Sequence, residues 1–152
     1  RLPNQLVEGL ENLDGPKRKV QLISKGIGHT EGDLIMYLPE DQILFSGDLL
    51  FHNRHPWLSD GSLSGWIDWL EFMNAQYIDW IVPGHGPIGS KIVISKMDEY
   101  INSLNDIALK MSSDQIPLDS VHSIEIPKSY ESWGFDRFFT PNLSFVYQSK
   151  IK

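Results

Sequence analysis

The chain has 152 residues, of which 41% are hydrophobic and 22% are charged, and its formal net charge is −7. This length fits one domain, and no apolar run approaches the roughly 18–20 residues that a membrane-spanning helix needs. The acidic balance argues against nucleic acid as a partner, because phosphate binding needs a clustered cationic face. The absence of cysteine excludes disulfides and thiolate chemistry, and it is compatible with a cytoplasmic location, which we expect.

The first part of the sequence predicts strands. Residues 1–16 are polar and are expected to form an irregular lead-in. Apolar runs then predict strands at about residues 20–23, 34–38 and 42–45, with a hairpin turn at Pro39-Glu40-Asp41 between the last two. The second and third runs are continuously hydrophobic rather than alternating, which is typical of a sheet covered on both faces.

The remainder predicts helices around one more strand. Apolar residues at steps of three and four predict a helix around residues 66–73 and a long helix over 93–111. Between them, residues 78–82 predict a strand. The segment 112–152 is weakly patterned, with a terminal helix expected over 142–152. The sum is an α/β fold with one mixed sheet and flanking helices on one side, and something must cover the other, apolar face of the sheet.

Three short polar motifs stand where predicted strands end: Gly28-His29-Thr30-Glu31-Gly32-Asp33, then Ser46-Gly47-Asp48, then Pro83-Gly84-His85-Gly86-Pro87. Each places a histidine or an aspartate beside glycines, which let the backbone turn tightly and approach a ligand. Imidazole and carboxylate are ligands that suit zinc and related divalent ions. Taken singly, such residues are more often turn formers or helix caps. The three together, in this order, favour a metal site.

These motifs resemble the C-terminal half of the metallo-β-lactamase superfamily, over about residues 20–90. The likeness is closest to the glyoxalase II-like and related hydrolases, which carry aspartate rather than cysteine at the middle position. Carried over position by position, the resemblance implies that His29 belongs to the first metal site and His85 to the second. It implies that Asp48 is a catalytic residue that bridges both metals. Thr30 and Asp33 match positions near His29 and are expected to support it rather than to bind metal.

The resemblance also implies what this sequence lacks. The superfamily's His-x-His-x-Asp-His signature, which supplies two ligands to each metal, lies in an N-terminal half that is not found here. The family fold is a four-layer αββα sandwich, so residues 1–152 are expected to form the C-terminal half of that domain. The first residue is Arg1 rather than Met, which fits a processed product, a fragment or a designed chain. The missing half is expected as a partner that covers the apolar sheet face, and without it that face would favour self-association.

The function implied by the resemblance is a metal-dependent hydrolase for a small-molecule substrate. Two zinc ions, with iron or manganese as alternatives, would share a hydroxide that attacks an ester, thioester, lactone or lactam. The isolated chain is expected to bind zinc weakly and to be inactive, because a catalytic zinc usually has three protein ligands. The alternative is a non-catalytic binding or assembly module that keeps the half-fold.

The loop of residues 51–57 follows Asp48 and, in the resembling enzymes, borders the mouth of the active site. We expect its His52, Arg54 and His55 to contact substrate, with Arg54 binding a carboxylate or phosphate. A polar surface loop without any contact to substrate is an equally weighted alternative.

Overall fold

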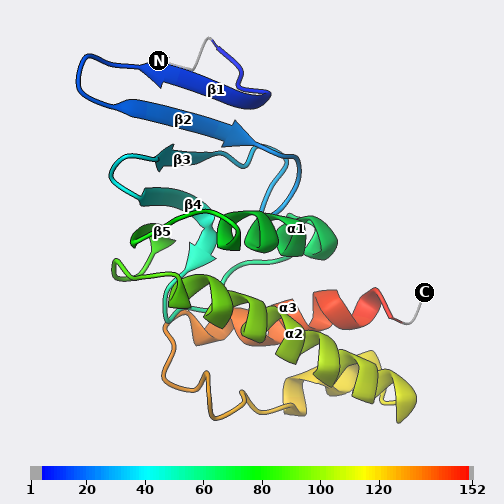
Figure 1. Ribbon diagram of the computed structural model, residues 1–152. Coiled ribbons are helices and arrows are strands. Elements are labelled where there is room, and N and C mark those ends of the chain that lie inside the picture. The colour runs from blue at the N-terminus through cyan, green and yellow to red at the C-terminus, as the bar shows by residue number, and fades with distance from the viewer. Residues whose placement is uncertain (1–4, 151–152) are drawn as a thin grey trace.

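The computed structural model describes residues 5–150 and confirms an α/β fold with one mixed, five-stranded sheet (Figure 1). The strands are β1 (Gly9–Asp14), β2 (Lys19–Ser24), β3 (Ile35–Leu38), β4 (Ile43–Phe51) and β5 (Trp80–His85). They lie side by side in chain order; β1 to β4 are antiparallel neighbours, and β5 is parallel to β4. The last pair can be parallel because a helix carries the chain from β4 back to the start of β5.

Three α-helices flank the sheet: α1 (Leu63–Asn74), α2 (Ile92–Ser113) and α3 (Phe139–Gln148), with short 3₁₀ helices at Leu118–Ser123 and Asp136–Phe138. Helices α1 and α2 pack against β4, and α3 packs against α2. The helical layer therefore lies over the β4–β5 end, and the β1–β2 hairpin stands at the far end from α2 and α3 (Figure 1). Within the described residues, no helix is both long enough and apolar enough to cross a bilayer.

The two faces of the sheet differ in burial. Leu44 and Ile81 are register partners on β4 and β5, and the helical layer buries both completely. The next residues along each strand, Phe45 and Val82, point to the opposite face and are only half-buried, as is Met36, the partner of Phe45 on β3. The predicted strands thus have the expected second apolar face, and it is less covered than the first.

The irregular lead-in predicted over residues 1–16 is wrong for its second half. Residues 9–14 form β1, which pairs with β2 along its whole length, from Gly9 opposite Ser24 to Asp14 opposite Lys19. The sequence of β1 has no β-branched or aromatic residue, and most of its side chains are exposed, so it carries no hydrophobic period. This strand is held in place by backbone hydrogen bonds to β2, and such bonds cannot be recognised from the pattern of side chains in the sequence.

Strand β4 is longer than the predicted run over residues 42–45. It continues to Phe51, with irregular register against β5 on both sides of Gly47. Gly47 adopts φ +53°, a conformation that glycine reaches without strain. Asp48 therefore lies inside a bulged strand rather than directly after it, and such bulges often redirect side chains next to active sites.

The weakly patterned segment 112–152 packs into the core. Tyr130 and Trp133 are buried there, and α3 begins at Phe139 rather than at residue 142. Pro141 lies in the first turn of α3, where a missing N–H breaks no helical hydrogen bond. The segment looks featureless in sequence because its buried aromatic residues come from short pieces that share no period.

The two edges of the sheet are formed by β1 and β5. At β5, Gly89 pairs with Ile81 through both backbone groups, with N···O distances of 2.7 and 3.0 Å. At β1, no further strand of the described chain lies on the outer side. The sheet is thus partly closed at one edge and open at the other.

Candidate metal site

Three elements bring His29, Asp48 and His85 together. His29 lies in the loop after β2, Asp48 in the bulged part of β4, and His85 at the end of β5. His29 Nε2 is 3.8 Å from Asp48 Oδ2, and His85 Nε2 is 3.4 Å from Asp48 Oδ1. Each imidazole thus faces a different oxygen of one carboxylate, and this carboxylate is 43% exposed.

The loop that carries His29 is shaped by Asp33. The carboxylate of Asp33 accepts hydrogen bonds from the backbone N–H of Gly28, at 2.8 Å, and of Thr30, at 3.1 Å. The Thr30 hydroxyl donates to the same carboxylate at 3.1 Å. Asp33 and Thr30 therefore close the turn around His29.

One tautomer of His29 is selected by a backbone carbonyl. His29 Nδ1 lies 2.9 Å from the carbonyl oxygen of Trp57, which can only accept, so Nδ1 carries the hydrogen. The Nε2 atom of the neutral ring then offers its lone pair toward Asp48. The ring packs edge-on against Trp66, with centroids 5.2 Å apart, which further restricts its orientation. A histidine that donates through its second nitrogen to a carbonyl is the usual arrangement of a metal ligand.

His85 is held by aromatic rings and by its own turn. It stacks on Phe51 with centroids 4.8 Å apart, and it meets the edge of Phe135 at 5.5 Å. The backbone N–H of His52 donates to the His85 carbonyl at 2.8 Å. Phe135 adopts φ +64°, a left-handed conformation that is strained for a bulky residue and that is often found at functional sites.

A glycine makes the approach of β4 and β5 at Asp48 feasible. A Cβ atom at Gly84 would lie 2.1 Å from Asp48 Oδ1 and 2.7 Å from the Gly47 carbonyl. Gly84 therefore sets the distance between the strand that carries Asp48 and the turn that carries His85. The position requires glycine for close approach, whereas Gly32 in the His29 loop has open space around its Cβ position.

Of the three residues expected to contact substrate, two remain accessible. His52 donates from Nδ1 to the Pro87 carbonyl at 2.8 Å, which leaves its Nε2 free of that contact. Arg54 lies against Gly134 and over the ring of Phe135, with the guanidinium carbon 5.6 Å from the ring centroid. The ring of Phe135 is therefore a neighbour of both Arg54 and His85.

The expectation that His55 contacts substrate is not supported, because His55 is 0% exposed. Its Nδ1 lies 3.0 Å from the Tyr100 hydroxyl and its Nε2 lies 3.2 Å from the Tyr130 carbonyl, so both nitrogens are used inside the core. The sequence places His55 in a polar loop, but the C-terminal segment folds over that loop and buries it. Its role in this structure is to join the loop to α2.

The burial of His55 predicts a pH-dependent stability. Burial lowers the pKa of His55, so the unfolded chain takes up this proton at a higher pH than the folded chain does. This part of the folding stability is therefore present above the ordinary histidine pKa of about 6.5 and is lost as the pH falls below it, by at most about 1.4 kcal/mol per pH unit. We expect His55→Gln to weaken the pH dependence of the unfolding free energy below about pH 6.5, measured by urea denaturation at a series of pH values. An equal slope in His55→Gln and the unsubstituted chain would contradict this.

The donor set fits zinc in type but not in number. Two imidazoles and one carboxylate are suitable ligands. Within residues 5–150, however, no three His, Asp or Glu side chains are grouped so that they could hold one metal ion. His29 and His85 face different oxygens of Asp48. The chain therefore offers one imidazole on each side of a shared carboxylate.

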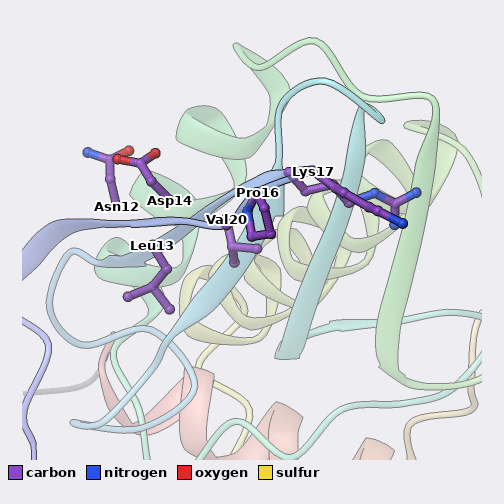
Figure 2. Close-up of a pocket in the computed structure, with 8 residues that line it drawn as sticks. Asn12, Leu13, Asp14, Pro16, Lys17 and Val20 are labelled. Carbon is purple, nitrogen blue, oxygen red and sulfur yellow. The ribbon is translucent and has the colours of Figure 1, made fainter.

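Open space accompanies these residues. A hollow of about 420 Å³ is lined by His29, by Asp48 and by the residues that neighbour each of them in the chain. A larger hollow lies on the β1–β2 hairpin, far from this site, where Asn12 and Asp14 point to one side and Leu13 and Val20 to the other (Figure 2). The side chains of the hairpin diverge and include no histidine, whereas the smaller hollow contains His29 and Asp48.

Several contributors to the site have no signal in the sequence. The carbonyl of Trp57 is a backbone group, and Phe135 lies 50 residues beyond His85 in the weakly patterned segment. Trp66 is visible only as part of a helical apolar stripe, although its ring packs against His29. In the sequence, only the glycines in each motif indicated that the backbone segments carrying these residues come close together.

Sequence comparison relates the chain to one family. The family model described as the metallo-beta-lactamase superfamily matches residues 1–85. The metallo-beta-lactamase type 2 of Bacillus sp. (strain 170) is 33% identical over 90 residues, which make up 56% of this chain and 35% of that protein. The chain thus spans about a third of the length of this relative.

Structural comparison extends the likeness to the helices. A solved metallo-beta-lactamase from Pontibacter korlensis has a TM-score of 0.60 at 24% identity, covering 66% of this chain and 49% of that one. The sec-alkylsulfatase Pisa1 from Pseudomonas sp. has a TM-score of 0.71 at 16% identity, covering 99% of this chain and 27% of that one. At these identities the likeness concerns the fold alone, and in the second case it includes the C-terminal segment with α3.

Proposed function

Because the chain belongs to the metallo-beta-lactamase superfamily, we propose that it is the C-terminal half of a glyoxalase II-like, metal-dependent hydrolase. The observation that carries the proposal is the placement of His29 and His85 at opposite oxygens of Asp48. This arrangement suits a carboxylate that bridges two metal ions, with one histidine belonging to each. The aspartate at the middle position supports the glyoxalase II-like branch.

We propose zinc as the metal, with iron or manganese as alternatives, and the remaining ligands as contributions of the N-terminal half. When bound, such ions would polarise the substrate carbonyl and activate water near neutral pH. The residues of this chain would hold and orient them. The Trp57 carbonyl fixes the His29 tautomer, Phe51 and Phe135 restrict His85, and Asp48 supplies negative charge between the two rings.

The proposed substrate is a small ester, thioester, lactone or lactam that carries an anionic group. Arg54 and Arg137 both lie over the ring of Phe135, each with its guanidinium carbon 5.6 Å from the ring centroid, and Phe135 contacts His85. A guanidinium stacked on a ring keeps its N–H edge available for a carboxylate or phosphate. We propose that Arg54 binds such a group and that His52 contacts substrate through Nε2.

The half-exposed apolar sheet face supports the assignment to one half of a four-layer domain. Phe45 and Val82 on this face are the side chains that a second sheet would bury. We propose the N-terminal half as the natural cover and self-association as the behaviour of the isolated chain. A cytoplasmic location, no nucleic-acid partner and no membrane attachment remain predictions that agree with the acidic, cysteine-free sequence.

Zinc titration by calorimetry tests the proposal. This chain alone is expected to bind zinc only weakly, because it supplies one histidine per site, whereas addition of the N-terminal half as a separate polypeptide is expected to create two tight sites. Asp48→Asn should remove the tight binding, and Asp68→Asn, which changes an exposed side chain on α1, should not. Sub-micromolar binding of two zinc ions by this chain alone would overturn the division of the site between two halves.

The alternative function is a non-catalytic binding or assembly module that keeps the half-fold. Hydrolysis assays distinguish the two functions. If the chain joined to its N-terminal half binds zinc but hydrolyses no thioester, lactone or lactam, the module is the better description. Turnover that depends on Asp48 would exclude it.

A further inference from the structure

A buried amide on the last helix is connected to His29 through a single peptide unit of the chain. We propose that Asn142 is a positioning residue for His29 and acts through the peptide unit between Trp57 and Leu58. The inference rests on the proposed role of His29 as a metal ligand, although the contacts that carry it do not depend on a metal. Asn142 lies in α3 and is 0% exposed.

Asn142 holds the backbone on both sides of Trp57. Its Oδ1 accepts a hydrogen bond from the Leu58 N–H at 3.1 Å, and its Nδ2 donates to the Pro56 carbonyl at 2.7 Å. These two bonds connect α3 to a loop more than 80 residues earlier in the chain. A buried amide without partners would be costly, so its presence here is explained by the loop that it binds.

The same peptide unit reaches His29 on its other side. A trans peptide is planar, and its C=O and N–H point in opposite directions. The N–H of the Trp57–Leu58 unit points to Asn142, so its C=O points away from Asn142 and accepts the hydrogen bond from His29 Nδ1 at 2.9 Å. Asn142 and His29 are therefore joined by two hydrogen bonds through one rigid plane, and linked bonds of this kind polarise one another.

Asn142 is itself fixed by α2. Its Nδ2 also donates to the Tyr100 hydroxyl at 3.3 Å, and this hydroxyl lies 3.0 Å from His55 Nδ1. The amide therefore makes three hydrogen bonds inside the core, of which two go to the loop and one to α2. Rotation of the Trp57 carbonyl would break the hydrogen bond from the Leu58 N–H to Asn142. The position of α3 therefore restrains the imidazole ring of His29, which lies 113 residues earlier in the sequence.

The tautomer of His29 is the direct readout. In long-range ¹H–¹⁵N spectra of this chain at about pH 8.5, where ordinary imidazoles are neutral, His29 is expected to be the Nδ1–H tautomer. In Asn142→Ala the ratio of the Nδ1–H to the Nε2–H form should fall about 2- to 10-fold, the range that corresponds to the net contribution of one hydrogen bond. Asn142→Ser serves as a second, smaller change with the same expected direction.

Tyr100→Phe is the matched control. It removes a hydroxyl from the same buried cluster and should lower the melting temperature by a few degrees, but it leaves both bonds from Asn142 to the loop intact. The His29 tautomer ratio should therefore stay unchanged in Tyr100→Phe. Equal ratios in all variants, an equal change in Tyr100→Phe, or loss of folding in both Asn142 variants would overturn the proposal and make Asn142 a core residue only.

A zinc titration of the same variants separates this inference from the proposed function. Suppose that Asn142→Ala changes the tautomer ratio and that this variant, combined with the N-terminal half, binds zinc at least about 10-fold more weakly than the unsubstituted chain does. Then both the positioning role of Asn142 and the metal assignment hold. If the tautomer changes but neither form binds zinc, the positioning stands and the metal assignment fails. If zinc binds equally tightly to Asn142→Ala and to the unsubstituted chain, and the tautomer ratio is the same in both proteins, the metal assignment stands and the positioning role fails.

Discussion

Gly84→Ala is expected to destroy the site while Asp48, His29 and His85 all remain in the sequence. The new methyl group would lie 2.1 Å from Asp48 Oδ1 and 2.7 Å from the Gly47 carbonyl, so either the carboxylate or the β5 turn must move. We expect zinc affinity, measured with the N-terminal half present, to fall at least about 100-fold, because ligand geometry tolerates only small displacements. Overpacking should also lower the unfolding free energy by about 1–3 kcal/mol.

Gly32→Ala is the control for that substitution, because Gly32 lies in the loop of His29 but a Cβ there meets no atom within 4 Å. It should leave zinc affinity within about 2-fold and stability within about 0.5 kcal/mol of the unsubstituted protein. An unchanged zinc affinity in Gly84→Ala would contradict this prediction. It would show that zinc binding does not require the Asp48 carboxylate to keep its position beside Gly84.

Trp66→Ala is expected to give a large loss of stability. Trp66 is 0% exposed, its indole N–H donates to the Leu49 carbonyl at 2.8 Å, and its ring forms the wall beside His29. Truncation of a fully buried tryptophan leaves a cavity and an unpaired carbonyl, so we expect the unfolding free energy to fall by about 3–5 kcal/mol in urea denaturation. Since domains of this size are stable by about 5–15 kcal/mol, the variant would be marginal.

Trp80→Ala makes the same chemical change at a side chain that is 57% exposed on β5. Its cost should stay below about 1 kcal/mol in the isolated chain. If the two tryptophan variants lost equal stability, the helical layer over β4 would not be the main core. Trp66 would then be no more important to the fold than a surface residue.

Most of the fold could be predicted from hydrophobic periodicity. The stripe around Trp66 and the stripe over residues 93–111 predicted α1 and α2 because both helices bury a single face, and helical spacing reports that directly. Strand β1 and α3 were missed or misplaced for different reasons. The first is held by backbone pairing alone, and the second is one of several short buried pieces without a common period.

The approach of His29, Asp48 and His85 was predicted from three polar motifs placed at strand ends of one sheet, although Asp48 lies inside β4 rather than at its end. Glycines next to each residue marked the close approaches. The partner atoms of His29 were not predictable, since a carbonyl such as that of Trp57 is present at every residue and only the fold selects one. His55 was misread for the same reason: its sequence neighbours are polar, and the segment that buries it arrives about 75 residues later.

The unequal edges of the sheet determine how this chain could meet a foreign strand. At β5 the backbone of Ile81 is already paired with Gly89, which blocks the middle of that edge. An incoming strand must therefore add beside β1, where Glu11 and Asp14 place negative charge along the free backbone. Charged side chains on an edge strand oppose cross-β stacking. The chain consequently carries its protection against fibre growth on the strand that contributes least to its core.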